Sequence, residues 1–268
     1  MVNKKKRQNN FSLKEEYKKS FDYLKNSKNF IYSAIIIFLI FLAIGLFFQD
    51  LVNLIFRNLF GVNLNQLILD FIKQLLEKTQ GMNQKELIGF IFVNNLLSSF
   101  VGLAVGSIFA IIPLFSCITN GYLLGYVLSV SVKVEGIMSI WKLFPHGIFE
   151  LPAVFISLGL GFRLGTYPFH SNNKERAFLS MFAFVFLFSI TYLILSIISP
   201  KGIPFLYYFL VALIFVGSFL VALAILTIQD RKMVIGLIKN SAITFLLVVL
   251  PLLILAAFIE GSLIVLGD

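Results

Sequence analysis

Seven long segments of mostly apolar residues run through this chain, and they restrict the folds that are open to it. A segment of roughly 18 or more apolar residues can cross the ~30 Å hydrocarbon core of a bilayer as a helix. Only 13% of the residues are charged, which is about half the share of a soluble domain, and the mean hydropathy is +0.93. The sequence therefore predicts an all-α, multi-span helical membrane protein.

The predicted spans alternate with connections that are short everywhere except after the first span. The spans cover about residues 30–48, 88–112, 116–132, 145–168, 177–199, 204–228 and 238–264. An odd number of spans puts the two termini on opposite sides of the membrane. One orientation leaves fifteen of the 22 Lys and Arg residues inside, which predicts a multi-pass protein of the plasma membrane with a cytosolic N-terminus.

Residues 1–29 form a basic segment ahead of a single transmembrane domain over residues 30–268. Nine Lys or Arg residues against three acids in this segment favour attraction to anionic lipid, and we expect no binding to nucleic acid. From Ser12, a capping box and an apolar stripe predict an amphipathic helix on the cytosolic membrane surface. The first span is too long for the core of a cleaved signal peptide, so we interpret it as a retained anchor.

The segment between the first two spans, about residues 50–87, carries a second amphipathic pattern. Asn63 is a candidate cap with Gln66 as its partner, and apolar residues then recur at helical spacing as far as Leu76. The pattern predicts an interfacial helix on the outer face, or one packed over the bundle.

Small residues share one face on each of three consecutive spans. Each face contains two glycines four residues apart, a spacing that lets helix backbones approach closely. The pairs are Gly102 and Gly106, Gly121 and Gly125, and Gly161 and Gly165. The sequence therefore predicts a compact, glycine-rich core of spans two to four, over about residues 88–168.

The candidate site consists of Asn94 and Asn95 on the second span and His146 and Glu150 on the fourth. Polar groups at membrane depth need partners, because the bilayer core offers no water. Both spans start outside, so the four side chains lie at a similar depth in the outer leaflet. We expect Asn94 or Asn95 to hydrogen-bond His146 or Glu150, and Arg163 to extend to the cytosolic interface.

Three interpretations of this cluster stay open. It could only tie helices together, since an acid near a helix N-terminus is favoured by the helix dipole. It could bind a ligand, an ion or a proton. It could hold a catalytic metal, but the only other histidine, His170, lies ~36 Å away at the helical rise, and no third ligand accompanies His146 and Glu150. We therefore predict no metal and no cofactor.

The same region resembles the stage II sporulation protein M family. The likeness rests on Asn94-Asn95, Asn120-Gly121, Pro145-His146-Gly147 with Glu150-Leu151-Pro152, and Gly161-Phe162-Arg163-Leu164-Gly165, over about residues 88–168. It implies an integral membrane protein whose Asn, His and Glu positions form the family's core, and it implies no enzymatic activity. The family's bacterial namesake works during forespore engulfment with proteins that remodel peptidoglycan, but the longer C-terminal membrane sequence of this chain argues against transferring that role.

These observations favour a non-enzymatic membrane component or scaffold. Such a protein would lie in the lipid bilayer and assemble with other membrane or envelope proteins, and homo-oligomerisation is left open. The alternative is a small-solute or ion permease that uses the polar site of His146 and Glu150. The third interpretation is an intramembrane hydrolase.

Overall fold

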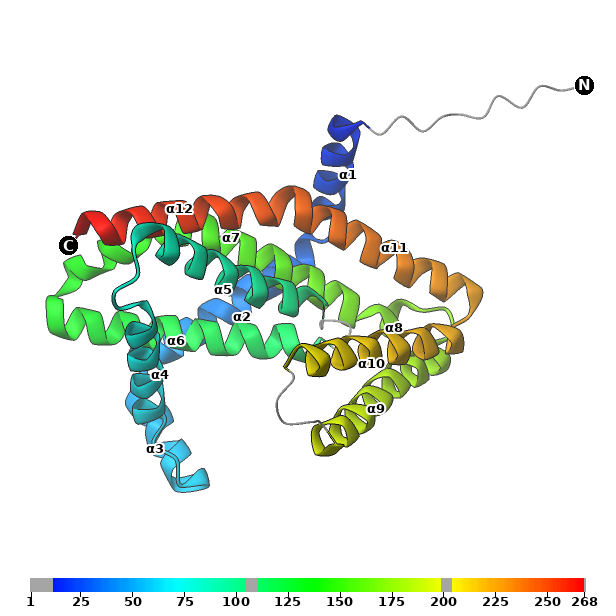
Figure 1. Ribbon diagram of the computed structural model, residues 1–268, viewed down its shortest axis with the longest axis horizontal. Helices are drawn as coiled ribbons and strands as arrows, with labels where there is room; N and C mark the ends of the chain where they lie inside the picture. The colour runs from blue at the N-terminus through cyan, green and yellow to red at the C-terminus, as the bar shows by residue number, and fades with distance from the viewer. Residues whose placement is uncertain (1–11, 105–109, 199–203, 268) are drawn as a thin grey trace, which may run out of the picture.

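The computed structural model describes residues 12–104, 110–198 and 204–267, and the regular elements in these ranges are helices (Figure 1). The long helices of the bundle are α2 (Lys28–Phe47), α5 (Gln84–Ala104), α6 (Ile111–Glu135), α7 (Ile140–Gly165), α9 (Lys174–Ile198), α10 (Pro204–Ile225) and α12 (Leu250–Gly267). The other helices are α1 (Leu13–Asn26), α3 (Gln49–Phe60), α4 (Leu64–Thr79), α8 (Tyr167–His170) and α11 (Ile228–Thr244).

Six helical stretches of the described residues are long and apolar enough to cross a membrane. Five of them lie in α2, α5, α6, α7 and α9, and the sixth runs from α11 into α12 over Ile228–Glu260. The remaining predicted span, residues 204–228, coincides with α10, of which Leu213–Ile225 is apolar but shorter. The multi-span helical class is therefore confirmed, whereas the number seven is only approximate.

Successive helices α2, α5, α6 and α7 alternate in direction, so that their ends gather at two levels, whereas α9 and α10 pack on each other beyond one of these levels, beside α11 (Figure 1). The start of α2 and the end of α7 share one level, because Ile31 contacts Gly159. The end of α5 lies there too, with the Gly102 carbonyl against Gly161. We call this level the inner end, following the predicted orientation, and the opposite level the outer end. In Figure 1, α12 ends beside the start of α7, at the outer end.

The most extensive helix contact joins α2 to α6, and glycines lie on both sides of it. A Cβ atom added at Gly121 would lie 2.5 Å from the Phe38 carbonyl oxygen. One added at Gly125 would overlap the Leu42 carbonyl oxygen, and Gly45 of α2 meets the α6 backbone in the same way. Only glycine permits two helix backbones to approach so closely.

The observed core is therefore wider than the predicted core of spans two to four. Gly102 and Gly161 pack α5 against α7, but Gly121 and Gly125 pack on α2, the first span. A glycine pair marks a face that permits close approach, but it does not identify the helix that approaches. Gly165 is buried near the inner end of α7, and Gly106 lies outside the described residues.

The last helix closes the bundle on another side. α12 packs against α5 and α7, and a cluster of buried residues that includes Leu103, Leu160 and Leu253 fills the space between them. One π-helical turn, Phe245–Val249, joins α11 to α12 without a break in the helix. Phe245 and Val249 belong to the same buried cluster.

Two amphipathic elements project from the bundle and run across its long axis in Figure 1. The first is α1, which begins after Ser12 as predicted, although the Ser12 side chain forms no capping bond. The second is the α3–α4 hairpin, whose main contacts lie within the hairpin and with α2. Asn63 caps α4 as predicted, its Oδ1 accepting the Gln66 amide at 3.1 Å. The sequence analysis did not predict α3 as a separate helix.

Candidate functional site

Glu150 lies in the outer half of α7 and is half-buried. Below it, toward the inner end, the same helix face becomes tightly packed. Ala153 and Ser157 are both 0% exposed, and Gly161 contacts the α5 backbone. The carboxyl group of Glu150 is therefore held at the outer edge of a dense core. The side chain of His146, one turn away in the predicted site, lies outside the described residues.

A second carboxyl group, from Glu260 on α12, lies near enough to Glu150 for the two to interact electrostatically. α12 packs along α7, which explains how residues more than a hundred positions apart become neighbours. No sequence motif links the two, and only the α7–α12 contact brings them together.

The structure separates the two asparagines of the predicted site. The Asn95 side chain is half-buried, whereas Asn94 is exposed on the surface of α5. Among the described residues, neither side chain forms a hydrogen bond, so neither is bonded to Glu150. Asn120, which belongs to the family-like motif Asn120-Gly121, bonds within its own helix, its Nδ2 donating to the Ser116 carbonyl oxygen at 2.8 Å and to Ser116 Oγ at 3.0 Å.

Two hydroxyl groups are buried in the packed faces of α5 and α7 without a hydrogen-bond partner in the described structure. They belong to Ser99, which is 1% exposed, and Ser157, which is 0% exposed. Ser99 lies one turn from Asn95, and Ser157 lies two turns from Glu150. A buried polar group without a partner costs stability, so these positions are candidates for a function or for an internal water molecule.

A polar junction that the sequence analysis missed ties α1 to the inner end of the bundle. Arg163 of α7 donates a hydrogen bond to Ser27 Oγ at 2.7 Å, and its guanidinium lies 4.4 Å from the centre of the Tyr23 ring. The Tyr23 hydroxyl in turn bonds Ser241 Oγ at 3.0 Å and the Leu237 carbonyl oxygen at 3.2 Å. The junction therefore links α1, α7 and α11.

The sequence predicted only that Arg163 extends to the cytosolic interface, and its partners on α1 were not predicted. The signals available in the sequence were Tyr23 and Ser27 at the end of a basic segment that ends just before the first span. An arginine at the inner end of a span prefers hydrogen-bond acceptors and an aromatic face to lipid. Its position alone could not identify those partners.

We expect the Tyr23→Phe variant to be less stable than the wild type near neutral pH, and its stability to depend less on pH above pH 10. Burial raises the pKa of the Tyr23 phenol above its ordinary value of 10.0. The folded state therefore holds this proton more tightly than the unfolded state, so the stabilisation is complete below pH 10 and is lost as the pH rises further. Near pH 7 the variant should lose about 1 kcal/mol, and above pH 10 its melting temperature should fall less steeply than that of the wild type. Thermal melting in detergent at several pH values measures both.

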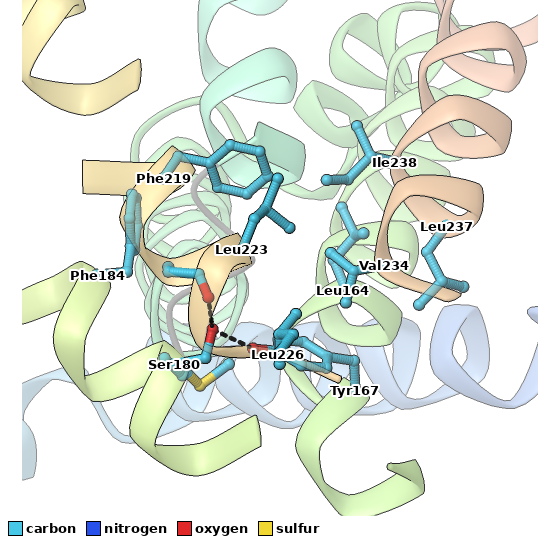
Figure 2. A pocket seen from close by; sticks show the side chains of 12 residues that line it. Leu164, Tyr167, Ser180, Phe184, Phe219, Leu223, Leu226, Val234, Leu237 and Ile238 are labelled. Atoms are coloured by element: carbon cyan, nitrogen blue, oxygen red, sulfur yellow. Dashed lines mark hydrogen bonds between the residues drawn. The ribbon is translucent and has the colours of Figure 1, made fainter. Parts of the chain in front are cut away.

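A small cavity lies at the inner end, between α7, α8, α9, α10 and α11 (Figure 2). Its lining is apolar apart from the hydroxyls of Tyr167 and Ser180, which are bonded to each other and to backbone oxygens, Ser180 Oγ donating to the Ala222 carbonyl at 2.6 Å. The cavity volume is about 30 Å³, close to that of one water molecule. This cavity is too small for an organic solute, and none of its lining residues belongs to the predicted site.

The neighbouring helix ends are fastened by charged side chains. Arg231 Nε donates to the Leu223 carbonyl oxygen at 2.9 Å, which caps the C-terminus of α10. Thr227 Oγ1 donates to Asp230 Oδ2 at 2.7 Å and accepts the Asp230 amide, which caps the start of α11. His170 also lies at this end, its ring against Phe30 and thus far from Glu150 along α7. The inner end is a well-bonded structural unit.

One protein family matches this chain over most of its transmembrane part. The stage II sporulation protein M model matches residues 34–195, which is more than half of the chain and runs from α2 into α9. The match includes Asn94, Asn95 and Glu150, and it encloses the region of residues 88–168 in which the sequence motifs lie. No curated protein and no solved structure matches the chain. This multi-span membrane protein belongs to the stage II sporulation protein M family.

Proposed function

We propose that this protein is a non-enzymatic scaffold of the plasma membrane that assembles with envelope-related partner proteins. Its N-terminus lies in the cytosol and its α3–α4 hairpin lies on the outer surface. The proposal is supported by family membership and by the excess of Lys and Arg at the inner end. The observation that carries it is the hairpin, because this part of the protein offers a large uncovered apolar surface outside the bundle.

One wide face of α3 is apolar and uncovered. Leu51, Ile55 and Leu59 follow one another at intervals of four residues and are 53%, 45% and 70% exposed. The polar side of α3 includes Asn53, whose Oδ1 accepts the Asn65 amide of α4 at 3.2 Å. A hydrogen bond on the polar side thus joins α3 to α4, and the apolar face of α3 is left for another molecule. A membrane-embedded segment of an envelope protein would cover this face and remain next to the bilayer.

The test compares partner recovery between surface variants. Tagged protein is cross-linked in its native membrane and purified, as the wild type and as a variant that carries both Ile55→Gln and Leu59→Gln. We expect the wild type to recover membrane proteins with domains that act on the cell envelope, and the double variant to lose them. Val134→Gln is the matched control, since Val134 is 78% exposed at the outer end of α6 but lies outside the hairpin. Equal recovery by the wild type and the double variant would reject the hairpin as the docking element.

The second candidate function is a permease for protons or small cations. One observation favours it, since the carboxyl groups of Glu150 and Glu260 interact electrostatically in the outer half of the bundle. Two acids that interact at membrane depth cost stability unless a proton or cation compensates them.

Glu150→Gln separates the two functions. The amide preserves shape and removes one of two interacting acids, so we expect the melting temperature in detergent to stay the same or to rise slightly. The scaffold proposal predicts that the variant complements a deletion strain as well as the wild type. Loss of complementation with unchanged melting would instead establish Glu150 as a pathway residue. Under each function, Glu260→Gln should give the same melting temperature and the same complementation as Glu150→Gln.

A further inference from the structure

The exposed side chain of Asn94 lies within a membrane span. The uncharged part of α5 begins at Leu87, so Asn94 is seven residues, or ~10 Å at the helical rise, below its start. That depth lies in the outer leaflet of the ~30 Å hydrocarbon core, where lipid tails offer no hydrogen bond.

A second exposed polar side chain, Ser98, lies one turn farther along the same face. Two other exposed hydroxyls on spans bond within their own helix, since Ser33 donates to the Asn29 carbonyl oxygen at 3.0 Å and Thr119 donates to that of Phe115 at 2.9 Å, although Ser189 of α9 does not within the described residues. In the part of the chain that the structure describes, neither Asn94 nor Ser98 forms such a bond. Two adjacent polar groups thus face lipid without partners, which is an expensive arrangement for an isolated chain.

The residues around them have the spacing of a helix–helix seam. Asn94, Leu97 and Val101 follow at intervals of three and four residues, with Ser98 beside them, and Leu97 and Val101 are 56% and 45% exposed. We call these four residues the α5 stripe. Intervals of three and four are those of the a and d positions of a left-handed helix pair, in which a single buried asparagine fixes the register.

We propose that the α5 stripe is a homodimer interface, in which Asn94 of one copy hydrogen-bonds Asn94 of a second copy. A carboxamide carries both a donor and an acceptor, so two of them complement each other. Two copies with the same orientation in one membrane have parallel α5 helices, and a twofold axis along the bilayer normal brings identical residues together at identical depth. From Leu87 to Ala104 the helix carries no charged residue that would repel its copy. The proposal does not rest on the scaffold function.

Symmetric cross-linking tests the geometry. The purified full-length chain is placed in vesicles of phosphatidylethanolamine and phosphatidylglycerol with Leu97→Cys, and disulfides are formed with copper phenanthroline. We expect cross-linked dimers, because a twofold axis brings position 97 close to its copy. Leu39→Cys is the matched control, being 51% exposed near the middle of α2. The wild type serves as the blank, because its single cysteine, Cys117, is buried. A chain that stays monomeric, or equal cross-linking at position 39, would reject the interface.

The role of the amide is tested on the Leu97→Cys background. Asn94→Leu should reduce the dimer fraction about tenfold at the same protein-to-lipid ratio, and Asn94→Gln, which restores an amide, should recover most of it. The melting temperature of Asn94→Leu in detergent should match that of the wild type, which separates loss of dimerisation from misfolding. Undiminished dimers with Asn94→Leu would contradict the assignment of Asn94 to the interface.

Discussion

The Gly125→Ala variant is expected to lose about 3 kcal/mol of stability, because a single methyl group would force α2 and α6 apart. The added Cβ atom would overlap the Leu42 carbonyl oxygen and lie 2.9 Å from the Leu46 amide nitrogen. Both are backbone atoms, so no side-chain rotation relieves the clash. The α2–α6 contact is the most extensive in the bundle, and separating it would expose the small-residue faces on both helices.

The matched control for this variant is Gly217→Ala in α10. No atom lies within 4 Å of a Cβ added at Gly217, and alanine favours a helix over glycine by about 1 kcal/mol. Thermal melting of both variants in one detergent should therefore move in opposite directions. If Gly125→Ala melted at the wild-type temperature, the close contact of the two backbones would be wrong.

The second large effect is expected for Arg163→Met, which should release α1 from the inner end. The guanidinium bonds Ser27 Oγ at 2.7 Å and lies over the Tyr23 ring. A charged hydrogen bond and a cation–π contact together contribute about 2–3 kcal/mol, and methionine retains only the apolar volume. The variant should therefore leave the bundle folded while α1 becomes accessible.

Limited trypsin digestion and hydrogen exchange of α1 measure this release. Lys25, next to the junction, should be cleaved faster in Arg163→Met than in the wild type. Lys19→Met is the control, because Lys19 is exposed and its ion pair with Glu16 at 2.6 Å lies within α1. Surface pairs of this kind contribute little to stability, so the control should behave as the wild type. Unchanged protection of α1 in Arg163→Met would show that the junction does not hold it.

Hydropathy and capping patterns predicted the helices because both are local properties. Each predicted span coincides with a helix, and Asn63 caps α4 with the expected Gln66 amide. The helix α3 escaped prediction because the amphipathic pattern of residues 50–87 was recognised only from its cap at Asn63 onward. The apolar face around Ile55, ahead of that cap, became visible only in the structure.

The candidate site depended on contacts that no local pattern encodes. The depth of Asn94 and Glu150 could be inferred from helical rise and span direction, but the rotation of α5 about its own axis could not. That rotation turned Asn94 outward and left Asn95 half-buried. Likewise, Gly121 indicated a close contact without indicating α2 as its partner.

The π turn between α11 and α12 has a consequence for the acidic pair. A π turn contains one residue more than an α-helical turn, so it offsets the helix that follows by one position, or about 100° of rotation. Uninterrupted α-helical spacing from Phe245 would direct Leu252 and Ile259 at the core. The structure instead buries Leu253 there and places Glu260 near Glu150. A relative that lacked one residue in Phe245–Val249 would therefore keep the equivalents of Leu253 and Glu260 on the same face with an ordinary α-helix, whereas this chain needs the π turn to keep Glu260 near Glu150.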